Sequence, residues 1–243
     1  MLFLYTQKKQ MITKETLTRI KFSILDSEIY DLARHILILF NKIKKKFYKK
    51  KNTIEVIEYW KNPNDGNNSP LIYTGEGYIT SDRDNLRTDN LIKIIKSFGF
   101  ENPSILEVGC NVGRNLNGLR KSGFKNLNAI EINSNAIDIM KKKFPETYEV
   151  SKITIGSAKD VLKKFQDNEF DIVFTMAVLQ HIPDENIKIV TKQISRIANK
   201  NLISSEAETY SSWRHFPRSY KKIYKNLNLK YLYRKNGARV FSK

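Results

Sequence analysis

A short apolar run that contains one acid leads directly into two glycines in this chain of 243 residues. Residues 105–108 (Ile-Leu-Glu-Val) have the apolar character of a parallel strand that is covered on both faces. Gly109 and Gly113 follow, and they allow the backbone to turn sharply and to approach a ligand closely. The pattern predicts a ligand-binding loop at the end of a buried strand, with an ordinary tight turn as the alternative.

The spacing of the loop bears on the kind of ligand. A dinucleotide loop has the pattern G-x-G-x-x-G, in which the second glycine admits the pyrophosphate and the third packs against the helix. Here those two positions hold Asn111 and Arg114. A ligand without phosphate needs less bare backbone, so the loop suits S-adenosylmethionine (SAM) better than a dinucleotide. The second alternative to a SAM-binding loop is a loop that binds a different nucleotide in an α/β protein.

The segment from Glu107 to Gly113 resembles the first motif of class I SAM-dependent methyltransferases, E/D-x-G-x-G-x-G. The chain departs from it at Asn111, which stands at the usual middle glycine, and we expect this residue to narrow the loop without abolishing the site. The resemblance covers residues 70–243. It implies a Rossmann-like, doubly wound α/β fold with a seven-stranded, mostly parallel sheet, an antiparallel C-terminal hairpin, and SAM as cofactor.

A second apolar run, residues 128–133, places Glu131 about 24 residues after Glu107, close to the spacing that presents an acid to ribose hydroxyls. The alternative is a strand-end acid that caps a helix beginning near Ser134. On the functional interpretation, Ile132 supplies an apolar face for adenine.

Two later segments resemble further motifs of the family. Residues 152–155 predict a third strand, and the loop after it carries Ser157 where an acid is more usual, so Ser157 is equally well explained as a helix N-cap. Residues 170–183 predict a fourth strand that ends beside the methyl group and runs into a loop with His181. The resemblance assigns cofactor binding to Arg83, Glu107, Gly109, Cys110, Asn111, Gly113, Glu131, Ile132, Ser157, Ala158, Thr175 and Met176.

The C-terminal segment gives an independent indication of topology. Residues 227–234 and 238–242 are apolar or alternating, and Asn236-Gly237 between them is the strongest short signal for a type I′ hairpin. An antiparallel hairpin that closes a parallel sheet resembles the last two strands of class I methyltransferases.

Two of the three histidines fall in loops expected over the carboxyl edge of the sheet, where ligands bind in open α/β folds. His181 is a candidate general base, because imidazole titrates near neutrality, and His215 is the second candidate catalytic residue. The alternative for His181 is a hydrogen bond to the loop backbone. The candidate acceptor-binding residues are Tyr73, Tyr78, Tyr210, Trp213, Arg214 and Arg218.

The segment before the first strand has the composition of a lid. A polar loop at residues 62–70 precedes two arginines that could pair with the SAM carboxylate, of which we favour Arg83 over Arg87, ahead of a helix at residues 88–98. Surface ion pairing is the alternative for both arginines. The candidate lid residues are Trp60, Asn67, Asn68, Tyr73 and Tyr78.

Composition limits the setting. The only cysteine, Cys110, excludes an internal disulfide framework, and Cys and His are too few for a structural zinc cluster. We therefore expect a cytoplasmic protein without a metal site, in which Cys110 fills a tight bend. The net charge of +18 is compatible with a polyanionic partner, and a compositional bias toward lysine is the alternative.

Much of the positive charge lies near the N-terminus, where residues 1–55 contain 13 basic and five acidic residues. Residues 27–51 predict a basic helix with apolar positions at helical spacing, which could contact an anionic membrane or RNA, or pack on the domain or a second subunit. We expect three parts: a basic helical arm (1–58), a lid and leading helix (59–103), and a SAM-binding domain (104–243).

These observations predict a SAM-dependent methyltransferase that acts on an oxygen or nitrogen of a small molecule or sugar, in surface-glycan biosynthesis. The alternatives are an RNA methyltransferase that uses the basic arm and a noncatalytic SAM-binding or membrane-associated scaffold. Neither an RNA-binding module nor the N/D-P-P-Y/F signature of amino-methylating nucleic-acid enzymes is found, since residues 175–178 are Thr-Met-Ala-Val.

Overall fold

The computed structural model describes residues 29–46, 52–63, 68–70 and 82–243, apart from the side chains of Ile29, Tyr30 and residues 82–85. Three helices precede the sheet: α3 (Ile29–Lys45), α4 (Thr53–Lys61) and α6 (Asp82–Lys96). The strands are β1 (Ile105–Val108), β2 (Leu127–Glu131), β3 (Ser151–Ile155), β4 (Phe170–Met176), β5 (Ala198–Ser205), β6 (Lys230–Lys235) and β7 (Ala238–Ser242). The helices between them are α7 (Arg114–Lys121), α8 (Ser134–Lys143), α9 (Pro145–Val150), α10 (Ala158–Val161), η3 (Leu162–Lys164), η4 (Leu179–His181), α11 (Asp184–Ile197) and α12 (Tyr220–Lys225).

The strands form one seven-stranded sheet in the order β3-β2-β1-β4-β5-β7-β6. The first five strands in chain order pair in parallel, while β7 is antiparallel to both β5 and β6. The order reverses between β1 and β4, so the chain crosses from one half of the sheet to the other there. This architecture confirms the predicted doubly wound fold with an antiparallel C-terminal hairpin.

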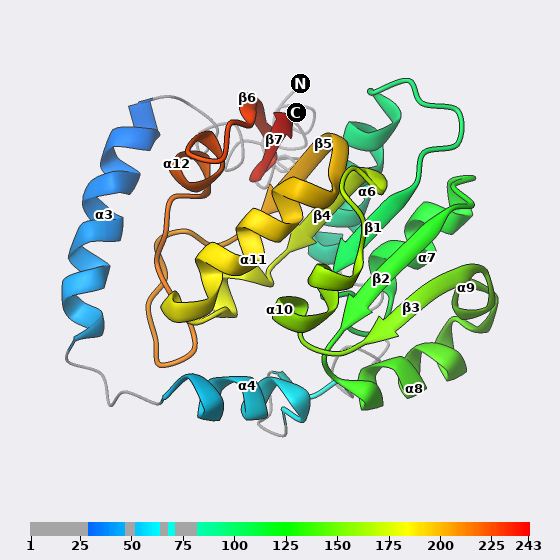
Figure 1. The fold of residues 1–243 in the computed structure, drawn as a ribbon, viewed down its shortest axis with the longest axis horizontal. Helices are drawn as coiled ribbons and strands as arrows, with labels where there is room; N and C mark the ends of the chain where they lie inside the picture. Colours follow the sequence, from blue (N-terminus) through cyan, green and yellow to red (C-terminus); the bar gives the residue numbers. More distant parts are fainter. Residues whose placement is uncertain (1–28, 47–51, 64–67, 71–81) are drawn as a thin grey trace, which may run out of the picture.

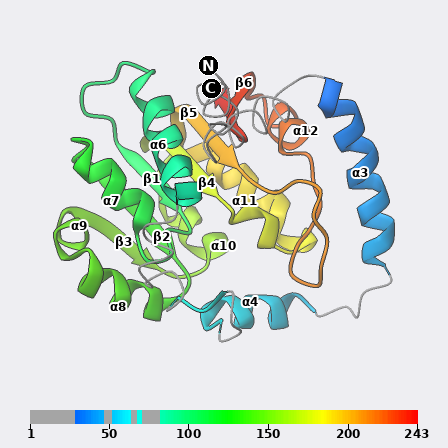
Figure 2. The ribbon, with the colours of Figure 1, turned by 180° about the vertical axis from the view of Figure 1, so that it is seen from behind.

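Both faces of the sheet are covered by helices, because successive strand residues point to opposite sides. On one face, Leu106 and Val173 pack with buried residues of α10, α11 and α12. On the other face, Ile105 and Ile172 pack with buried residues of α6, α7 and α8. Figure 1 shows α11 in front of the sheet, and Figure 2 shows α6 and α7 on the face behind it.

The hairpin at residues 236–237 has the predicted turn. Asn236 and Gly237 have φ values of 51° and 84°, and a type I′ turn requires positive φ at both central residues. The strand before the turn begins at Lys230, later than the predicted Leu227, because α12 and the short turn after it occupy the preceding residues.

Two helix boundaries also differ from the prediction. Helix α6 begins at Asp82, so Arg83 and Arg87 lie within it and not before it. Helix α3 spans Ile29–Lys45, and the predicted continuation of this helix to residue 51 falls mostly outside the described residues.

Helix α3 lies along the outer margin of the domain beside α12, as Figure 1 shows. Asp31 forms ion pairs with Lys221 at 3.0 Å and with Arg239 at 3.4 Å. Arg34 lies 3.6 Å from Glu208, which also binds the buried Arg239. The polar side of the helix therefore attaches it to the domain.

Candidate functional site

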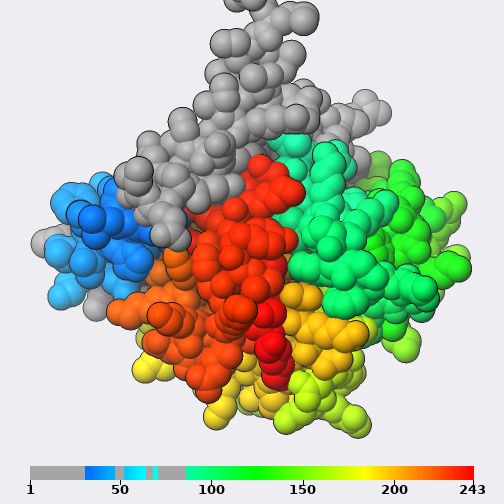
Figure 3. Space-filling view, turned by 90° about the horizontal axis from the view of Figure 1, so that it is seen from above, coloured from blue at the N-terminus to red at the C-terminus, as the bar shows by residue number. Residues whose placement is uncertain are grey.

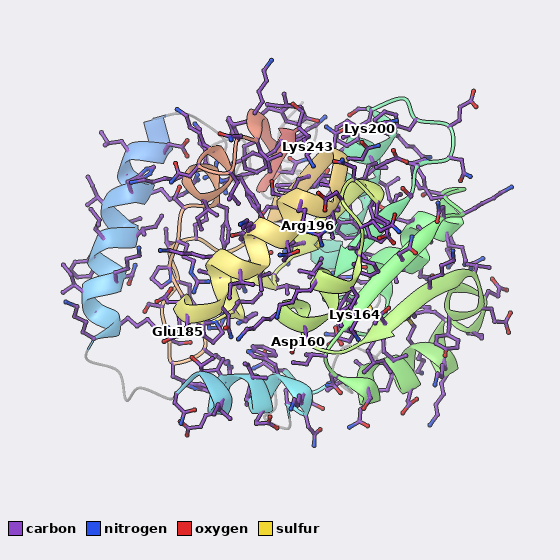
Figure 4. All side chains as sticks on the ribbon, in the orientation of Figure 1. Asp160, Lys164, Glu185, Arg196, Lys200 and Lys243 are labelled. Carbon is purple, nitrogen blue, oxygen red and sulfur yellow. The ribbon has the colours of Figure 1, made fainter. Side chains whose placement is uncertain are left out.

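A cavity of about 420 Å³ lies at the carboxyl ends of β1–β4, the edge at which open α/β sheets bind ligands. The loops after these four strands supply one wall. Helix α4 supplies another, through Val56, Ile57 and Trp60. In Figure 4, Glu185 and Asp160 mark this side of the sheet, while Lys200 and Lys243 lie toward the opposite side. The cavity thus lies at the edge of the sheet where the sequence predicts a ligand site.

The loop between β1 and α7 turns through three residues in the left-handed region. Gly109, Asn111 and Gly113 have φ values of 78°, 50° and 76°. Asparagine tolerates this region better than other side chains do, which explains how Asn111 occupies the position of the family's middle glycine. Gly109 and Asn111 line the cavity, and Gly113 packs against Met140 below it.

Glu131 ends β2 and fixes the loop. One carboxylate oxygen accepts a hydrogen bond from the Asn111 amide at 2.7 Å, and the other accepts one from the Asn133 amide at 2.9 Å. Burial raises the pKa of Glu131, and these amides oppose the shift. Helix α8 is capped by the side chain of Asn133, so the alternative role of Glu131 as that helix's cap is wrong.

Glu107 is buried in the floor of the cavity. Its Oε1 accepts a hydrogen bond from Asn115 at 2.7 Å, and Asn115 in turn accepts one from the Thr88 hydroxyl at 2.8 Å. Glu107 Oε2 has no hydrogen-bond partner in the part of the chain that the structure describes. Burial raises the pKa of Glu107 to about 8. The site therefore contains a carboxyl group whose second oxygen is available to a ligand.

The loop after β3 forms the far end of the cavity, where Ser157 and Ala158 join Ile132 in the lining. Ser157 caps α10: its hydroxyl accepts a hydrogen bond from the Asp160 amide at 3.3 Å and donates one to the Asp160 carboxylate at 2.6 Å. The N-cap expected as one of two explanations is thus present, in a residue that also lines the cavity.

At the end of β4, Met176 lines the cavity, whereas Thr175 is buried beneath it. The loop that follows is held by Glu206, which accepts a hydrogen bond from the Gln180 amide at 3.2 Å. Burial raises the pKa of Glu206 to about 7, against the opposing effect of the Thr175 hydroxyl and loop amides. Cys110 also lines the cavity, and burial raises the pKa of its thiol well above the usual value, which keeps it unreactive.

His181 and His215 both line the cavity, with ring centroids 4.4 Å apart. His181 Nδ1 lies 3.0 Å from the carbonyl oxygen of Arg214, so this nitrogen carries the proton. His181 Nε2 then accepts a hydrogen bond from the side-chain amide of Gln180 at 3.1 Å. Burial, with His215 and Arg214 nearby, lowers the pKa of His181 to about 3. Both ring nitrogens of His181 are therefore engaged, including the expected bond to loop backbone.

His215 has a different environment. Its Nδ1 lies 2.7 Å from the Ser212 hydroxyl, and its Nε2 has no hydrogen bond to any residue that the structure describes. Burial and the neighbouring Arg214 and Lys45 lower the pKa of His215 to about 4, so the ring is neutral at pH 7. Of the two histidines in the cavity, His215 is the one with a ring nitrogen available to a bound substrate.

Aromatic contacts hold α4 over the cavity. Trp60 packs on His181 with ring centroids 4.2 Å apart, and Tyr59 packs on Trp213 at 4.9 Å. The Tyr59 hydroxyl accepts hydrogen bonds from Arg214 and Asn68, each at 2.9 Å. At the other end of α4, Thr53 donates to Glu185 at 2.7 Å. Trp60 and Asn68 both line the cavity, and their role as lid residues stays a prediction.

Several expected acceptor-binding residues do not line the cavity. The guanidinium of Arg218 binds the carbonyls of Leu179 and Ile182 and the carboxylate of Asp184, which uses its donors to hold the loop after β4. Trp213 and Arg214 hold α4, and Tyr210 packs against His215 at 4.6 Å. These residues support the loops and the helix that line the acceptor side, without lining the cavity themselves.

The remaining candidates are only partly described. Arg87 lines the cavity, whereas the side chain of Arg83 is outside the described atoms. Asn67, Tyr73 and Tyr78 lie outside the described residues.

The structure adds three residues that the sequence analysis missed: Asn115, Gln180 and Asn186, all buried and all in the cavity lining. Gln180 stands directly before His181, and Asn115 is the second residue of the helix after the glycine loop. A buried amide beside a motif residue was the available signal for both. Asn186 had none, because only the packing of α11 brings it to the cavity.

These features define a class of protein: an open α/β protein in which a glycine loop and an acid at the end of β2 meet at the carboxyl edge of the sheet, where such folds bind ligands. Residues 106–201 match the family model described as a methyltransferase domain. Among curated proteins, phosphoethanolamine N-methyltransferase 2 of Caenorhabditis elegans is 30% identical over 98 residues, which cover 40% of this chain and 22% of that protein. An uncharacterized protein of Haemophilus influenzae is 28% identical over 109 residues, which cover 44% of this chain and 43% of that protein.

Solved structures share the fold. Magnesium protoporphyrin IX methyltransferase of Synechocystis with bound SAH has a TM-score of 0.58 at 14% identity, covering 79% of this chain and 98% of that one. Phosphoethanolamine N-methyltransferase 2 of Haemonchus contortus in complex with SAM has a TM-score of 0.55 at 15% identity. The match covers 72% of this chain and 44% of that one. The chain spans less than half the length of both curated relatives that it matches.

Residues 106–201 therefore match a methyltransferase domain, and the sheet order agrees with the class I SAM-dependent methyltransferase fold that the glycine loop and the strand-end acids predicted. SAM is the cofactor of that family. Within the described residues, every helix is too short or too polar to span a bilayer.

Gly109 offers a test of the loop geometry. A Cβ at Gly109 would collide with the β-branched side chain of Val178, and its φ of +78° is strained for alanine. We expect Gly109→Ala to lower the free energy of unfolding by about 2 to 4 kcal/mol in urea denaturation. Gly99 has a similar φ of +72° with open space around it, so Gly99→Ala should show only the backbone penalty, about 1 kcal/mol. Equal losses in the two variants would contradict the predicted close approach.

His181 gives a prediction on pH. Its folded pKa of about 3 lies below the unfolded value near 6.5, so the unfolded chain takes up the proton first as pH falls. The stability that the neutral ring contributes is complete above pH 6.5 and is lost below it. Between pH 7.5 and pH 5, the stability difference between wild type and His181→Gln should shrink by about 2 kcal/mol. Urea denaturation measures it, with His35→Gln as the exposed control; a constant difference would mean that His181 titrates normally.

Proposed function

We propose that this protein transfers the methyl group of SAM to an oxygen or nitrogen of a small acceptor molecule. The observation that carries the proposal is the 420 Å³ cavity at the carboxyl edge, which holds two buried acids beside the glycine loop and is covered by α4. A covered cavity of this size fits a cofactor with a small acceptor better than a polymer. The wider assignment to sugar methylation in surface-glycan biosynthesis belongs to the same proposal.

The residues around the cavity fit SAM. Each oxygen of Glu131 accepts one backbone amide and keeps a lone pair for a ribose hydroxyl. Glu107 Oε2, buried and without a partner among the described groups, suits the ammonium group, and Arg87 suits the carboxylate. Ile132 and Ala158 supply apolar surface for adenine.

The acceptor is proposed to lie between α4 and the loops after β4 and β5. The indole N–H of Trp60 is buried without a partner among the described atoms, so it is a donor for an acceptor oxygen. Asn186 and His215 lie on the same lining. Their polar groups, spaced among Ile57, Ile182 and Val190, favour a small molecule with a few hydrogen-bonding groups over a purely apolar one.

The bound sulfonium supplies an activated methyl group, so the protein's contribution is alignment of the acceptor and removal of its proton. His181 and His215 are the candidate bases. Because both nitrogens of His181 are engaged, we favour His215, whose Nε2 is available when Ser212 accepts a hydrogen bond from Nδ1–H. His181 then orients Trp60 and the loop and acts as a positioning residue.

The curated relative from Caenorhabditis elegans is named for methylation of the nitrogen of phosphoethanolamine. The match to it covers 98 residues, 40% of this chain. A nitrogen acceptor is therefore within the proposal, and its chemical identity is a matter for acceptor screening with SAM labelled in the methyl group.

Calorimetric titration with SAM, and in parallel with NAD, tests the proposed cofactor. We expect micromolar binding of SAM and no heat with NAD. Since burial holds the pKa of free Glu107 at about 8, a cation beside it should expel a proton, so SAM affinity should rise from pH 6.5 to pH 8. Titrations in buffers of different ionisation enthalpy measure the released proton.

Glu107→Gln keeps the size of the side chain and the contact to Asn115 but removes the titrating group. This variant should bind SAM about tenfold more weakly at pH 8 and release no proton. Glu101→Gln, at an exposed position in the same strand-leading segment, is the control. Failure of the folded wild-type protein to bind SAM would overturn the function, whereas binding without proton release would overturn only the role of Glu107.

The base assignment separates the two histidines. His215→Ala should lower kcat by roughly a hundredfold at pH 7 with SAM affinity unchanged if the acceptor is a hydroxyl. His181→Gln should mainly raise the KM of the acceptor, since Trp60 would lose its packing partner. Full activity of His215→Ala, measured as methyl transfer to an acceptor found by screening, would remove it as the base.

A further inference from the structure

One side of α3 is apolar and turned toward solvent. Its large aliphatic and aromatic side chains are between 50% and 72% exposed. They are Leu32, Ile36, Leu37, Leu39, Phe40 and Ile43. Helices on the surface of a globular domain bury such a stripe against the core. In this protein the arrangement is reversed, so the exposed stripe needs a different explanation.

The opposite side of α3 faces the domain and is mainly polar. Asp31 and Arg34 bind charged residues of the domain, as described above. At the C-terminal end, Lys45 donates hydrogen bonds to the carbonyls of Ser212 and His215, at 2.9 and 2.6 Å.

These contacts determine which side of the helix faces outward. Successive residues of a helix are about 100° apart, so Asp31, Arg34, Ile38 and Lys45 share one side and Ile36 and Phe40 lie opposite. Turning the apolar stripe inward would break the ion pairs of Asp31 and Arg34 and the hydrogen bonds of Lys45. Glu208, which is 6% exposed, would lose the Arg34 cation 3.6 Å away, and its buried carboxylate would be less well compensated.

The charges beside the stripe are positive. Lys42 and Lys46 lie on one flank and Lys44 on the other, all exposed. The only acid of α3, Asp31, is turned toward the domain. An apolar stripe with lysines on both sides is the pattern of a helix that lies flat in a membrane interface, where the lysines reach the headgroups.

We propose that α3 binds the surface of an anionic lipid bilayer, with its axis in the plane of the membrane. The stripe would enter the boundary between headgroups and acyl chains, and Lys42, Lys44 and Lys46 would pair with lipid phosphates. A nucleic acid matches the lysines but gains nothing from Leu, Ile and Phe side chains. The bilayer matches both the apolar stripe and its charged flanks.

The position of α3 is consistent with this contact. The helix lies on the outermost margin of the domain in Figures 1 and 3, away from α8 and α9. Its C-terminal end contacts the loop that carries His215, so a membrane-bound α3 holds the acceptor side of the cavity close to the lipid surface.

Vesicle flotation of the full chain tests the proposal. Vesicles of phosphatidylcholine with 30% phosphatidylglycerol should bind the protein, and vesicles of phosphatidylcholine alone should bind it at least tenfold more weakly. Ile36→Asp with Phe40→Asp should lower binding by tenfold or more, because both side chains enter the bilayer. Replacing Lys42, Lys44 and Lys46 with Gln should weaken binding to the anionic vesicles and reduce its salt dependence. Val150→Asp, at a 50% exposed apolar position on α9, is the matched control and should bind as wild type does.

A conservative variant locates the contact. Phe40→Trp should be quenched by brominated lipid, while the native Trp60 and Trp213 in the covered site should not. Wild-type protein that fails to float with anionic vesicles would overturn the proposal. So would flotation that the Ile36→Asp, Phe40→Asp variant retains, since residues outside α3 would then carry it. A stable dimer that the same variant dissociates would assign the stripe to a second copy of the chain. None of these outcomes depends on methyl transfer.

Discussion

The carboxylate of Glu131 joins the two chain segments on which the cofactor site depends. It accepts one hydrogen bond from the glycine loop at Asn111 and another from the end of β2 at Asn133. Three residues of that loop are left-handed, so without a fixed acceptor the loop would have many alternatives. Because Glu131 also lines the cavity, the residue that shapes the loop is the same one that we propose for the ribose. Structural and functional explanations of Glu131 are therefore complementary.

The acceptor side is held together differently, by long-range contacts between loops. Gln180 accepts a hydrogen bond from the Ala207 amide and contacts His181, which is bound to the carbonyl of Arg214. Arg218 binds two carbonyls of the loop after β4. Several polar groups of the loop after β5 thus bind polar groups of the loop after β4. Buried networks of this kind are rigid only when complete, so the two loops form one unit.

The sequence was sufficient for features that depend on local pattern. Apolar runs located β1, β2 and β4, Glu107 in β1 and Glu131 at the end of β2 marked the ligand edge, and Asn236-Gly237 specified the hairpin turn. It was insufficient where distant groups decide. The role of Arg218 depends on carbonyls 36 and 39 residues away. The outward orientation of the apolar stripe of α3 could not be predicted from the helical pattern. Periodicity defines the two sides of a helix but does not say which one faces the domain. Ion pairs with Lys221 and Arg239 made that choice.

The loop of residues 206–219 connects helices α3 and α4 to the cavity. Lys45 of α3 binds the carbonyls of Ser212 and His215, while Arg214 of the same loop binds Tyr59 of α4. Burial lowers the pKa of Lys45 to about 8, so its two carbonyl bonds replace lost hydration of a charged group. A displacement of α3 would therefore be felt at His215, and a displacement of α4 at Arg214 and His181. The acceptor side is thus assembled from segments far apart in the chain, whereas the cofactor side is built from consecutive strand–loop–helix units.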